Sequence, residues 1–183
     1  MAPAGTVARS VVLIGMMGAG KTSVAGVLAA RLGCRALDTD HMVEEEAGMS
    51  VPALFAACGE RAFRDAESSA IESLVLLPAP TVVSVGGGAV LRERNRRALR
   101  RLGMVVWLRA RPATLAARVG SADGRPVLGR EDGELLETMD KLVAERRPFY
   151  EEVADLIVDV DTLSPEEVAD IVAAKLAAAA QLS

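Results

Sequence analysis

Short apolar stretches rich in β-branched residues alternate along the chain with longer segments of helical periodicity. The stretches that predict strands are Val11–Ile14, Cys34–Asp38, Thr81–Val85, Met104–Leu108 and Leu156–Val160. The segments that predict helices are Thr22–Leu32, His41–Ala47, Val51–Ala57, Ala62–Leu76, Glu93–Leu102, Pro112–Arg118, Glu134–Ala154 and Pro165–Ala180. This alternation favours an α/β fold with a parallel sheet between helical layers. In such folds ligands bind at the carboxyl ends of the strands.

The first predicted strand runs directly into a phosphate-binding motif. Residues 15–22 read Gly-Met-Met-Gly-Ala-Gly-Lys-Thr and match the pattern G-x-x-x-x-G-K-S/T, between a strand and a helix as the motif requires. Glycine lets backbone N–H groups approach a polyphosphate, while the lysine reaches the β and γ phosphates and the threonine hydroxyl binds Mg²⁺. An ordinary glycine-rich turn is the alternative. The predicted nucleotide-binding residues of this motif are Gly18, Ala19, Gly20, Lys21, Thr22 and Ser23.

Length and composition indicate one domain that spans residues 1–183. Such a chain is long enough to build its own core, and although 51% of its residues are hydrophobic, no apolar run approaches the roughly twenty residues of a membrane span. Residues 1–8 lack the apolar core of a signal peptide and are expected to form a flexible tail. We therefore expect a cytoplasmic protein without membrane contact, and two reduced, structural cysteines, Cys34 and Cys58.

Charge and aromatic content argue against a nucleic-acid partner. The net charge is −4 and only 3% of residues are aromatic, so platforms for base stacking are few. Arg92–Arg101 holds six arginines against one glutamate, a run that is usually a solvated helix face. The only histidine, His41, has no evident partners for a catalytic triad and is more simply a solvated side chain.

Two carboxylates follow the second predicted strand, in the sequence Asp38-Thr39-Asp40. Side-chain alternation places both on the same side of the chain as it leaves the sheet. One carboxylate could hold Mg²⁺, and the other could accept the proton of an acceptor alcohol during phosphoryl transfer. The alternative is a turn in which an aspartate caps the next helix.

Two glycine-rich segments stand apart from the phosphate loop. Gly86-Gly87-Gly88 ends the third apolar run, and its exposed backbone N–H groups suit close approach of a small polar ligand, although a strained turn has the same sequence. Residues 120–133 contain four glycines, one proline and several charges with little to bury. This segment is interpreted as a lid, against the alternative of a plain surface connection.

Taken together, these motifs resemble those of shikimate kinases along nearly the whole chain. The shared segments are the phosphate loop, Asp38-Thr39-Asp40, residues 59–67 (Gly-Glu-Arg-Ala-Phe-Arg-Asp-Ala-Glu), the glycine triplet, Arg118 with Arg125-Pro126, and residues 145–150 (Glu-Arg-Arg-Pro-Phe-Tyr). The resemblance implies a three-layer α/β/α P-loop NTPase domain with a central five-stranded parallel sheet and a lid. It further implies transfer of the ATP γ-phosphoryl to the 3-hydroxyl of shikimate, on the route to chorismate and the aromatic amino acids.

The resemblance also assigns the acceptor site. Asp40 is similar to the family's acid that binds the shikimate hydroxyls and is its best candidate base, whether it takes the proton or only positions the hydroxyl. Arg64 and Arg146 match the pair that grips the substrate carboxylate, and Gly86, Gly87 and Gly88 match the backbone beside the ring. The planar fork of arginine suits a carboxylate. Without the family pattern, Arg64 could instead pair with Glu60 or Glu67, and Glu67 could also orient Arg64 for the substrate. Arg147 could likewise replace Arg146.

For the nucleotide, the resemblance assigns Asp38 beside the metal, with Thr22 as the other metal ligand. Arg118 is similar to the arginine that packs on adenine. Arg125 resembles the lid arginine that swings onto the phosphates and, with Lys21 and Asp40, completes the predicted catalytic set. The adenine pocket is expected to include backbone near residues 161–165. A solvated loop charge is the alternative for Arg125.

Several residues depart from this pattern or stay ambiguous. Phe149 stands where the family commonly has an aliphatic residue, and Ser84 occupies a strand where other P-loop enzymes place an acid. Phe55 and Phe63 have the spacing of core residues, yet the family uses aromatic residues here to wall the substrate ring. Trp107 is most simply a core residue.

We therefore expect a monomeric ATP-dependent kinase that uses ATP as co-substrate, Mg²⁺ as cofactor and shikimate as acceptor. Two other functions are weighed. A related kinase of the same fold could act on gluconate or another polyol acid, and a regulatory module could bind nucleotide without chemistry. Retention of Lys21, Thr22, Asp38 and Asp40 argues against the second, and dependence of ATP turnover on shikimate would decide between them.

Overall fold

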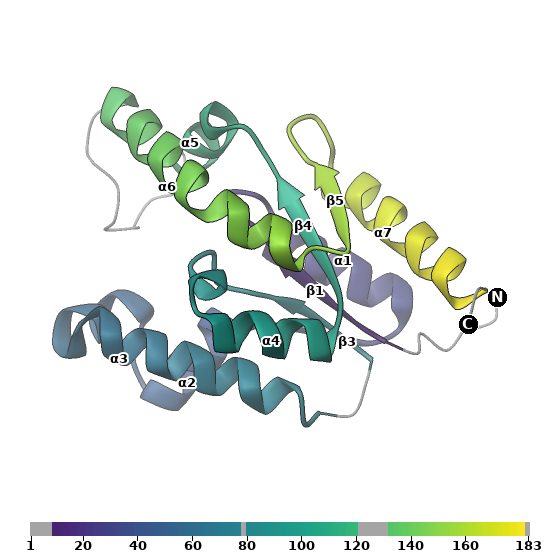
Figure 1. Ribbon diagram of the computed structural model, residues 1–183, viewed down its shortest axis with the longest axis horizontal. Helices are drawn as coiled ribbons and strands as arrows, with labels where there is room; N and C mark the ends of the chain where they lie inside the picture. The colour runs from purple at the N-terminus through teal and green to yellow at the C-terminus, as the bar shows by residue number, and fades with distance from the viewer. Residues whose placement is uncertain (1–8, 78–79, 121–131, 182–183) are drawn as a thin grey trace.

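The protein is described by a computed structural model that covers residues 9–77, 80–120 and 132–181 (Figure 1). Its strands are β1 (Ser10–Ile14), β2 (Arg35–Asp38), β3 (Thr81–Ser84), β4 (Gly103–Arg109) and β5 (Leu156–Asp159). Its helices are α1 (Lys21–Leu32), α2 (Thr39–Ala47), α3 (Val51–Leu74), the short 3-10 helix η1 (Ala89–Leu91), α4 (Glu93–Leu102), α5 (Pro112–Gly120), α6 (Asp132–Val153) and α7 (Pro165–Ala180). The predicted order of strands and helices is confirmed.

The strands form one parallel five-stranded sheet in the order β2-β3-β1-β4-β5. The central strand β1 is buried along its whole length, and Val11, Val12 and Leu13 are fully inaccessible to solvent. Continuous apolar runs of this kind are typical of parallel strands covered on both faces. The edge strands β2 and β5 are only partly buried, as expected where a sheet meets solvent.

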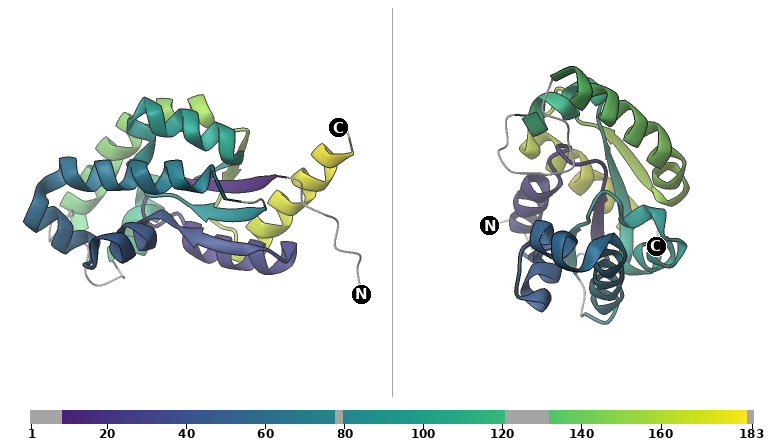
Figure 2. Two further views of the ribbon diagram at one scale, coloured as in Figure 1. Left: turned by 90° about the horizontal axis from the view of Figure 1, so that it is seen from below. Right: turned by 90° about the vertical axis from the view of Figure 1, so that its left-hand side faces the viewer.

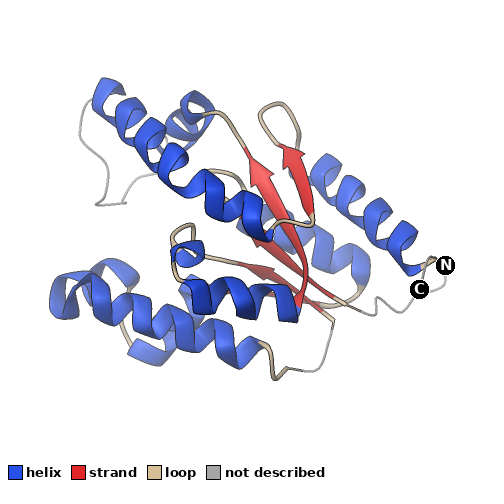
Figure 3. Cartoon of the chain, viewed as in Figure 1, coloured by secondary structure: helices blue, strands red, loops and turns tan. Residues whose placement is uncertain are grey.

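Helices cover both faces of the sheet. Figure 2 shows α1 and α7 on one side, and α4 and α6 on the other, which gives the predicted three layers. In the cartoon of Figure 3, the helical pair α2 and α3 lies beyond the carboxyl end of β2 and extends the molecule on that side. Because all five strands are parallel, their carboxyl ends meet at one edge, where the segments that follow β1, β2 and β3 come together.

Two local features differ from the sequence prediction. The predicted helices Val51–Ala57 and Ala62–Leu76 are joined as α3, which kinks at Gly59, where φ is 79° and ψ is 171°. A left-handed φ is accessible to glycine without steric conflict, so the chain bends here and continues as helix. Helix α2 begins at Thr39, earlier than predicted, because the Asp38 side chain caps it by accepting a hydrogen bond from the N–H of Asp40 at 3.0 Å.

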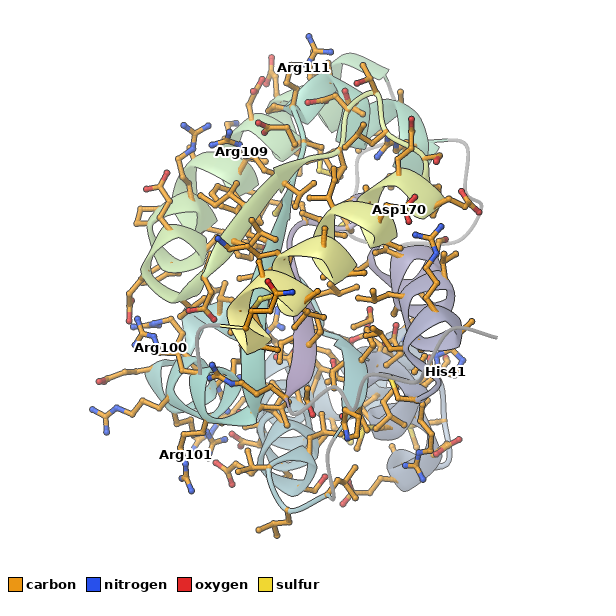
Figure 4. The ribbon with its side chains drawn as sticks, turned by 90° about the vertical axis from the view of Figure 1, so that its right-hand side faces the viewer. His41, Arg100, Arg101, Arg109, Arg111 and Asp170 are labelled. Atoms are coloured by element: carbon orange, nitrogen blue, oxygen red, sulfur yellow. The ribbon has the colours of Figure 1, made fainter. Side chains whose placement is uncertain are left out.

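The arginine-rich segment is a paired helix face. Its arginines contact acids in and around α4: Arg92 and Arg94 contact Asp65, Arg96 and Arg100 contact Glu152, and Arg97 contacts Glu93. Figure 4 shows Arg100, Arg101 and His41 pointing away from the body of the molecule. The prediction of a solvated face is confirmed for Arg94, Arg97 and Arg100. Arg92 is only partly exposed, and Arg96 is 11% exposed and donates to the carbonyl of Val90 at 2.8 Å.

Both cysteines are free; Cys34 is half-buried and Cys58 is exposed, so only Cys34 has the buried character of a structural thiol. Trp107 is buried in the core, as predicted. Within the described ranges no helix is both long and apolar enough to cross a membrane.

Candidate active site

The phosphate loop lies between β1 and α1, where the sequence predicts it. Gly18 and Gly20 have φ values of 80° and 85°, so the loop depends on glycine at both positions. A Cβ on Gly15 would lie 2.5 Å from the carbonyl oxygen of Leu108, which excludes a side chain there. Helix α1 has Gly20 at its N-cap and no side-chain cap, so its first N–H groups face the loop and suit an anion.

Lys21 and Thr22 are held at the base of this loop. The Lys21 ammonium donates to the carbonyls of Gly15 and Met16, both at 2.9 Å, which keeps its charge inside the curve of the loop. The Thr22 hydroxyl donates to Oδ2 of Asp38 at 2.8 Å and lies 3.4 Å from the Ser84 hydroxyl. Three oxygen-bearing side chains from α1, β2 and β3 therefore gather beside the phosphate loop.

The pair Asp38 and Asp40 is arranged differently from the prediction. Strand alternation does not relate them, because Asp40 already lies in the first turn of α2. Asp38 combines the two roles that the sequence leaves open: Oδ1 caps α2 and Oδ2 faces Thr22. Asp40 points instead toward Gly86, since a Cβ on that glycine would lie 2.9 Å from its Oδ1. The two carboxylates thus serve neighbouring sites, one beside the metal-ligand candidates and one beside the glycine triplet.

A pocket of about 240 Å³ opens beside the phosphate loop at the start of α1. Gly18, Ala19, Gly20, Ser23 and Arg118 are among its lining residues, and all five are predicted nucleotide-binding residues. Leu163 and Pro165 from the predicted adenine segment form an apolar wall together with Val160, which lies just before that segment. Arg118 is fixed at its rim by donating to the carbonyl of Val160 at 2.8 Å. The pocket has the mixed lining that a nucleoside requires.

The glycine triplet, Gly86 to Gly88, lies at the carboxyl end of β3 and contacts the predicted acceptor residues from three elements. A Cβ on Gly86 would lie 2.5 Å from Oε1 of Glu67, and a Cβ on Gly88 would lie 2.6 Å from Nη1 of Arg64. A Cβ on Gly87 would lie 3.5 Å from Nη1 of Arg146. A side chain at Gly86 or Gly88 would displace these charged groups, whereas the distance at Gly87 is an ordinary contact. The absence of side chains at Gly86 and Gly88 therefore leaves room for Glu67 and Arg64 beside the triplet.

Arg64 and Glu67 form an ion pair on α3 that faces this space. Nη1 of Arg64 donates to Oε2 of Glu67 at 3.0 Å, and Nε contacts Glu60 at 3.4 Å, so the alternative pairings foreseen for Arg64 occur alongside its place at the triplet. Glu67 is 1% exposed, and burial raises the pKa of its carboxyl against the opposing charge of Arg64. Its Oε1 has no hydrogen-bond partner among the described residues. A hydrogen-bond acceptor without a described partner is therefore present beside the glycine triplet.

Arg146 and its neighbour Arg147 differ sharply. Arg146 is 8% exposed, its Nη1 lies 3.9 Å from the sulfur of Met16, and its Nε has no hydrogen-bond partner in the described part of the chain. Arg147, the alternative left open by the sequence, is exposed. A buried guanidinium with an unpaired donor is rarely tolerated except where a ligand anion completes it. The structure thus brings Arg146, and not Arg147, to the triplet.

Three residues of the site were not singled out from the sequence. Thr39 is fully buried and its hydroxyl accepts a hydrogen bond from the N–H of Gly86 at 3.0 Å. The Tyr150 hydroxyl donates to the carbonyl of Gly87 at 2.7 Å. Met16 places its sulfur against Arg146 and Tyr150. All three lie within recognised motifs, but Met16 occupies a variable position of the phosphate-loop pattern, so the pattern gives it no role.

The ambiguous aromatic pair proves to be both packed and near the site. Phe63 is buried and its ring lies 4.6 Å from that of Phe55, within an apolar cluster of α2 and α3. The guanidinium carbon of Arg64 lies 5.0 Å from the centre of the Phe63 ring. Arg125 and residues 121–131 of the predicted lid lie outside the described residues.

The fold and this arrangement define a P-loop phosphotransferase: the phosphate loop and the pocket beside it adjoin the glycine triplet, where Asp40, Arg64 and Arg146 come together. Residues 17–177 match the family model of shikimate kinase. The shikimate kinase of Symbiobacterium thermophilum is 43% identical over 169 residues, covering 91% of this chain and 95% of that protein. That of Ruegeria pomeroyi is 44% identical over 169 residues, covering 92% and 85%.

Solved structures agree with the sequence relatives. Shikimate kinase from Acinetobacter baumannii in complex with shikimate superposes with a TM-score of 0.89 at 30% identity, covering 96% of this chain and 98% of that one. A gluconokinase from Sinorhizobium meliloti, 24% identical with a TM-score of 0.63, shares the fold. The chain belongs to the shikimate kinase family, whose activity is the ATP-dependent phosphorylation of shikimate. The predicted fold, family and enzyme class are thereby confirmed.

Proposed function

We propose that this chain transfers the γ-phosphoryl of ATP to the 3-hydroxyl of shikimate at the glycine triplet, with each residue in the role its position supports. The observation that carries the proposal is the convergence of Asp40, Arg64 and Arg146 on Gly86 to Gly88, beside the phosphate loop. A Cβ on Gly87 would lie only 3.2 Å from the carbonyl oxygen of Gly15, so acceptor and phosphate sites adjoin. Adjacent sites allow direct transfer between bound partners.

In the proposed reaction, the acceptor hydroxyl oxygen forms a bond to the γ-phosphorus as the bond from that phosphorus to the β,γ-bridging oxygen breaks. The hydroxyl proton passes to Asp40, whose Oδ1 faces the triplet. Lys21 and the N–H groups of the loop stabilise charge on the phosphates. Arg64 and Arg146 hold the shikimate carboxylate, and Glu67 orients Arg64 through their ion pair.

Mg²⁺ is the proposed cofactor, with Thr22 and Asp38 as its protein ligands. Their oxygens lie 2.8 Å apart beside the phosphate loop, and hydroxyl and carboxylate oxygens are the donors that Mg²⁺ prefers. Such sites commonly use one or two protein ligands together with water and phosphate oxygens. When bound, Mg²⁺ supplies neutralisation of phosphate charge. The monomeric state, the single domain and the cytoplasmic location remain proposals.

The direct test of acceptor identity is a panel of alcohols assayed with Mg-ATP for ADP release. We expect turnover with shikimate and little with gluconate, because two arginines and a flat glycine surface suit a rigid cyclic carboxylate better than a flexible chain. Equal turnover with gluconate would favour the related polyol-acid kinase. ADP release that does not depend on any acceptor would contradict the assignment of this site.

Truncation of Arg146 should weaken shikimate binding selectively. Arg146→Ala removes a buried charge-assisted contact to the carboxylate and is expected to raise the KM for shikimate about 30-fold, equivalent to about 2 kcal/mol, with the KM for ATP little changed. Arg147→Ala is the matched control, because it removes an exposed arginine from the adjacent position of the same helix. Steady-state kinetics with each substrate varied in turn measure both effects. An equal rise in the KM for shikimate in the two variants would mean that the shikimate carboxylate does not bind at Arg146.

A further inference from the structure

The hydroxyl of Tyr150 forms a hydrogen bond with the backbone of the glycine triplet. Tyr150 lies on α6, is 1% exposed, and donates its hydroxyl proton to the Gly87 carbonyl at 2.7 Å. Its ring stacks on that of Trp107, with the centres 5.4 Å apart and the planes inclined by 23°. The hydroxyl is thus fixed by a rigid side chain anchored in the core. The mechanism proposed above makes no use of this buried group.

The backbone carbonyls of the triplet are all engaged. Those of Gly86 and Gly88 accept local hydrogen bonds from the N–H groups of Ala89 and Leu91, at 3.0 and 3.1 Å. The Gly87 carbonyl is the one held from outside this turn, by Tyr150. On the donor side, the Gly86 N–H is taken by Thr39. Within the described residues, the N–H groups of Gly87 and Gly88 have no acceptor, so these two donors remain for a ligand.

The hydrogen bond from Tyr150 determines the direction of one of these donors. In a trans peptide the carbonyl of one residue and the N–H of the next point in opposite directions. Because the Gly87 carbonyl points at the Tyr150 hydroxyl, the N–H of Gly88 is turned to the opposite side of the chain. Glycine has no side chain and a wide range of backbone conformations, so the triplet itself does not restrict the orientation of this peptide.

Tyr150 also lies against the carboxylate clamp. It follows Arg146 by one helical turn on α6, which puts the two side chains on the same face. The Tyr150 hydroxyl oxygen lies 3.6 Å and Nη1 of Arg146 3.9 Å from the same sulfur, that of Met16 in the phosphate loop. Burial raises the pKa of Tyr150, so its hydroxyl remains a protonated donor at neutral pH.

We infer that Tyr150 is a positioning residue of the acceptor site: its hydroxyl orients the Gly87–Gly88 peptide so that the free N–H of Gly88 binds an oxygen of the acceptor. The inference rests on the proposed function, since it takes the triplet as the surface that carries shikimate. If the role of Tyr150 were purely structural, its loss would lower the stability of the fold and weaken the binding of shikimate and of ATP to a similar extent. If Tyr150 positions the triplet, its loss weakens the binding of shikimate and leaves the binding of ATP little changed.

Tyr150→Phe keeps the ring and removes only the hydroxyl. We expect the KM for shikimate to rise about five- to tenfold, as for the loss of one buried hydrogen bond, with kcat and the KM for ATP changed less than threefold. Calorimetric titration with shikimate alone should show the same weakening. A folded variant with unchanged shikimate affinity, or with equal losses for shikimate and ATP, would overturn the inference.

Trp107→Phe is the matched control, because it disturbs the same stack without touching a hydrogen bond of the triplet. Its melting temperature should fall while the KM for shikimate stays within twofold of the parent; a rise equal to that of Tyr150→Phe would assign the effect to packing and refute positioning. The activity of the parent enzyme distinguishes a failure of the proposed function from a failure of the inference about Tyr150. Failure to phosphorylate shikimate refutes the proposed function, whereas an active parent with an indifferent Tyr150→Phe variant refutes the inference alone.

A second measurement covers the case in which Tyr150→Phe does not fold. Tyr150 is the only tyrosine of the chain, so 3-fluorotyrosine labels this position alone. Its ¹⁹F resonance should shift on saturation with shikimate, because the ring is one hydrogen bond from the peptide that contacts the acceptor. An unchanged resonance at saturation would count against the role of Tyr150.

Discussion

Lys21→Ala is expected to lower kcat by about 10³-fold while the fold is retained. Loss of a single preorganised donor at a developing charge lowers kcat by roughly 10²- to 10³-fold, and Lys21 also supplies a full positive charge. The ammonium is already directed into the loop by the Gly15 and Met16 carbonyls, so its position is built into the protein. Coupled measurement of ADP release at saturating ATP and shikimate gives kcat directly.

The control for this variant is Lys141→Ala, which removes an exposed lysine from α6. It should leave kcat within twofold of the parent. Thermal melting of both variants separates loss of chemistry from loss of fold, because Lys21 also holds two loop carbonyls. Near-normal turnover by folded Lys21→Ala would refute the assignment of the phosphate site.

The sheet was predictable from sequence because its strands are buried on both faces. The runs at Val11–Ile14 and Met104–Leu108 contain almost only apolar residues, and such runs mark central strands of a parallel sheet. The phosphate loop was predictable for another reason: its residues are adjacent in the chain, so one local pattern contains the whole site. The start of α2 was missed, because the Asp38 cap that begins the helix has the same sequence as a turn.

The acceptor site is harder to predict because distant segments build it. Arg64 on α3 and Arg146 on α6 are separated in the chain by β3, η1, α4, β4 and α5, and both approach the triplet only in the fold. Sequence motifs supplied their identity, but the choice between Arg146 and Arg147 depends on which side of α6 is buried. The contact of Tyr150 with Gly87 joins residues 63 positions apart and has no signal in local pattern.

The phosphate loop and the acceptor site share part of their structure. Met16 belongs to the loop, yet its sulfur touches both Arg146 and Tyr150, which belong to the acceptor side. Asp38 caps α2, the helix that carries Asp40, while its other oxygen contacts Thr22 of the loop. One set of side chains therefore fixes the spacing of the two sites, and in-line transfer depends on that spacing.

Asp40→Asn is expected to lower kcat by about 10³-fold with a much smaller change in the KM for shikimate. Asparagine keeps the shape and one hydrogen-bond acceptor, so the acceptor hydroxyl remains bound, but it cannot take the proton, and general-base catalysis typically contributes 10²- to 10⁴-fold. Asp40 is the aspartate whose Oδ1 faces the triplet, whereas Asp38 is engaged by Thr22 and the α2 cap.

The control for Asp40→Asn is Glu46→Gln, which neutralises an exposed carboxylate on the same helix and should leave kcat within twofold of the parent. Turnover is measured at saturating ATP over a range of shikimate concentrations, and binding of shikimate alone by calorimetry. If kcat is retained and only the affinity for shikimate falls, Asp40 positions the hydroxyl without accepting its proton, and the proton must leave by way of the phosphate or water. If kcat and the affinity for shikimate both stay unchanged, the acceptor does not bind at Asp40. Neutralising a carboxylate that contacts the bound hydroxyl would change at least one of the two.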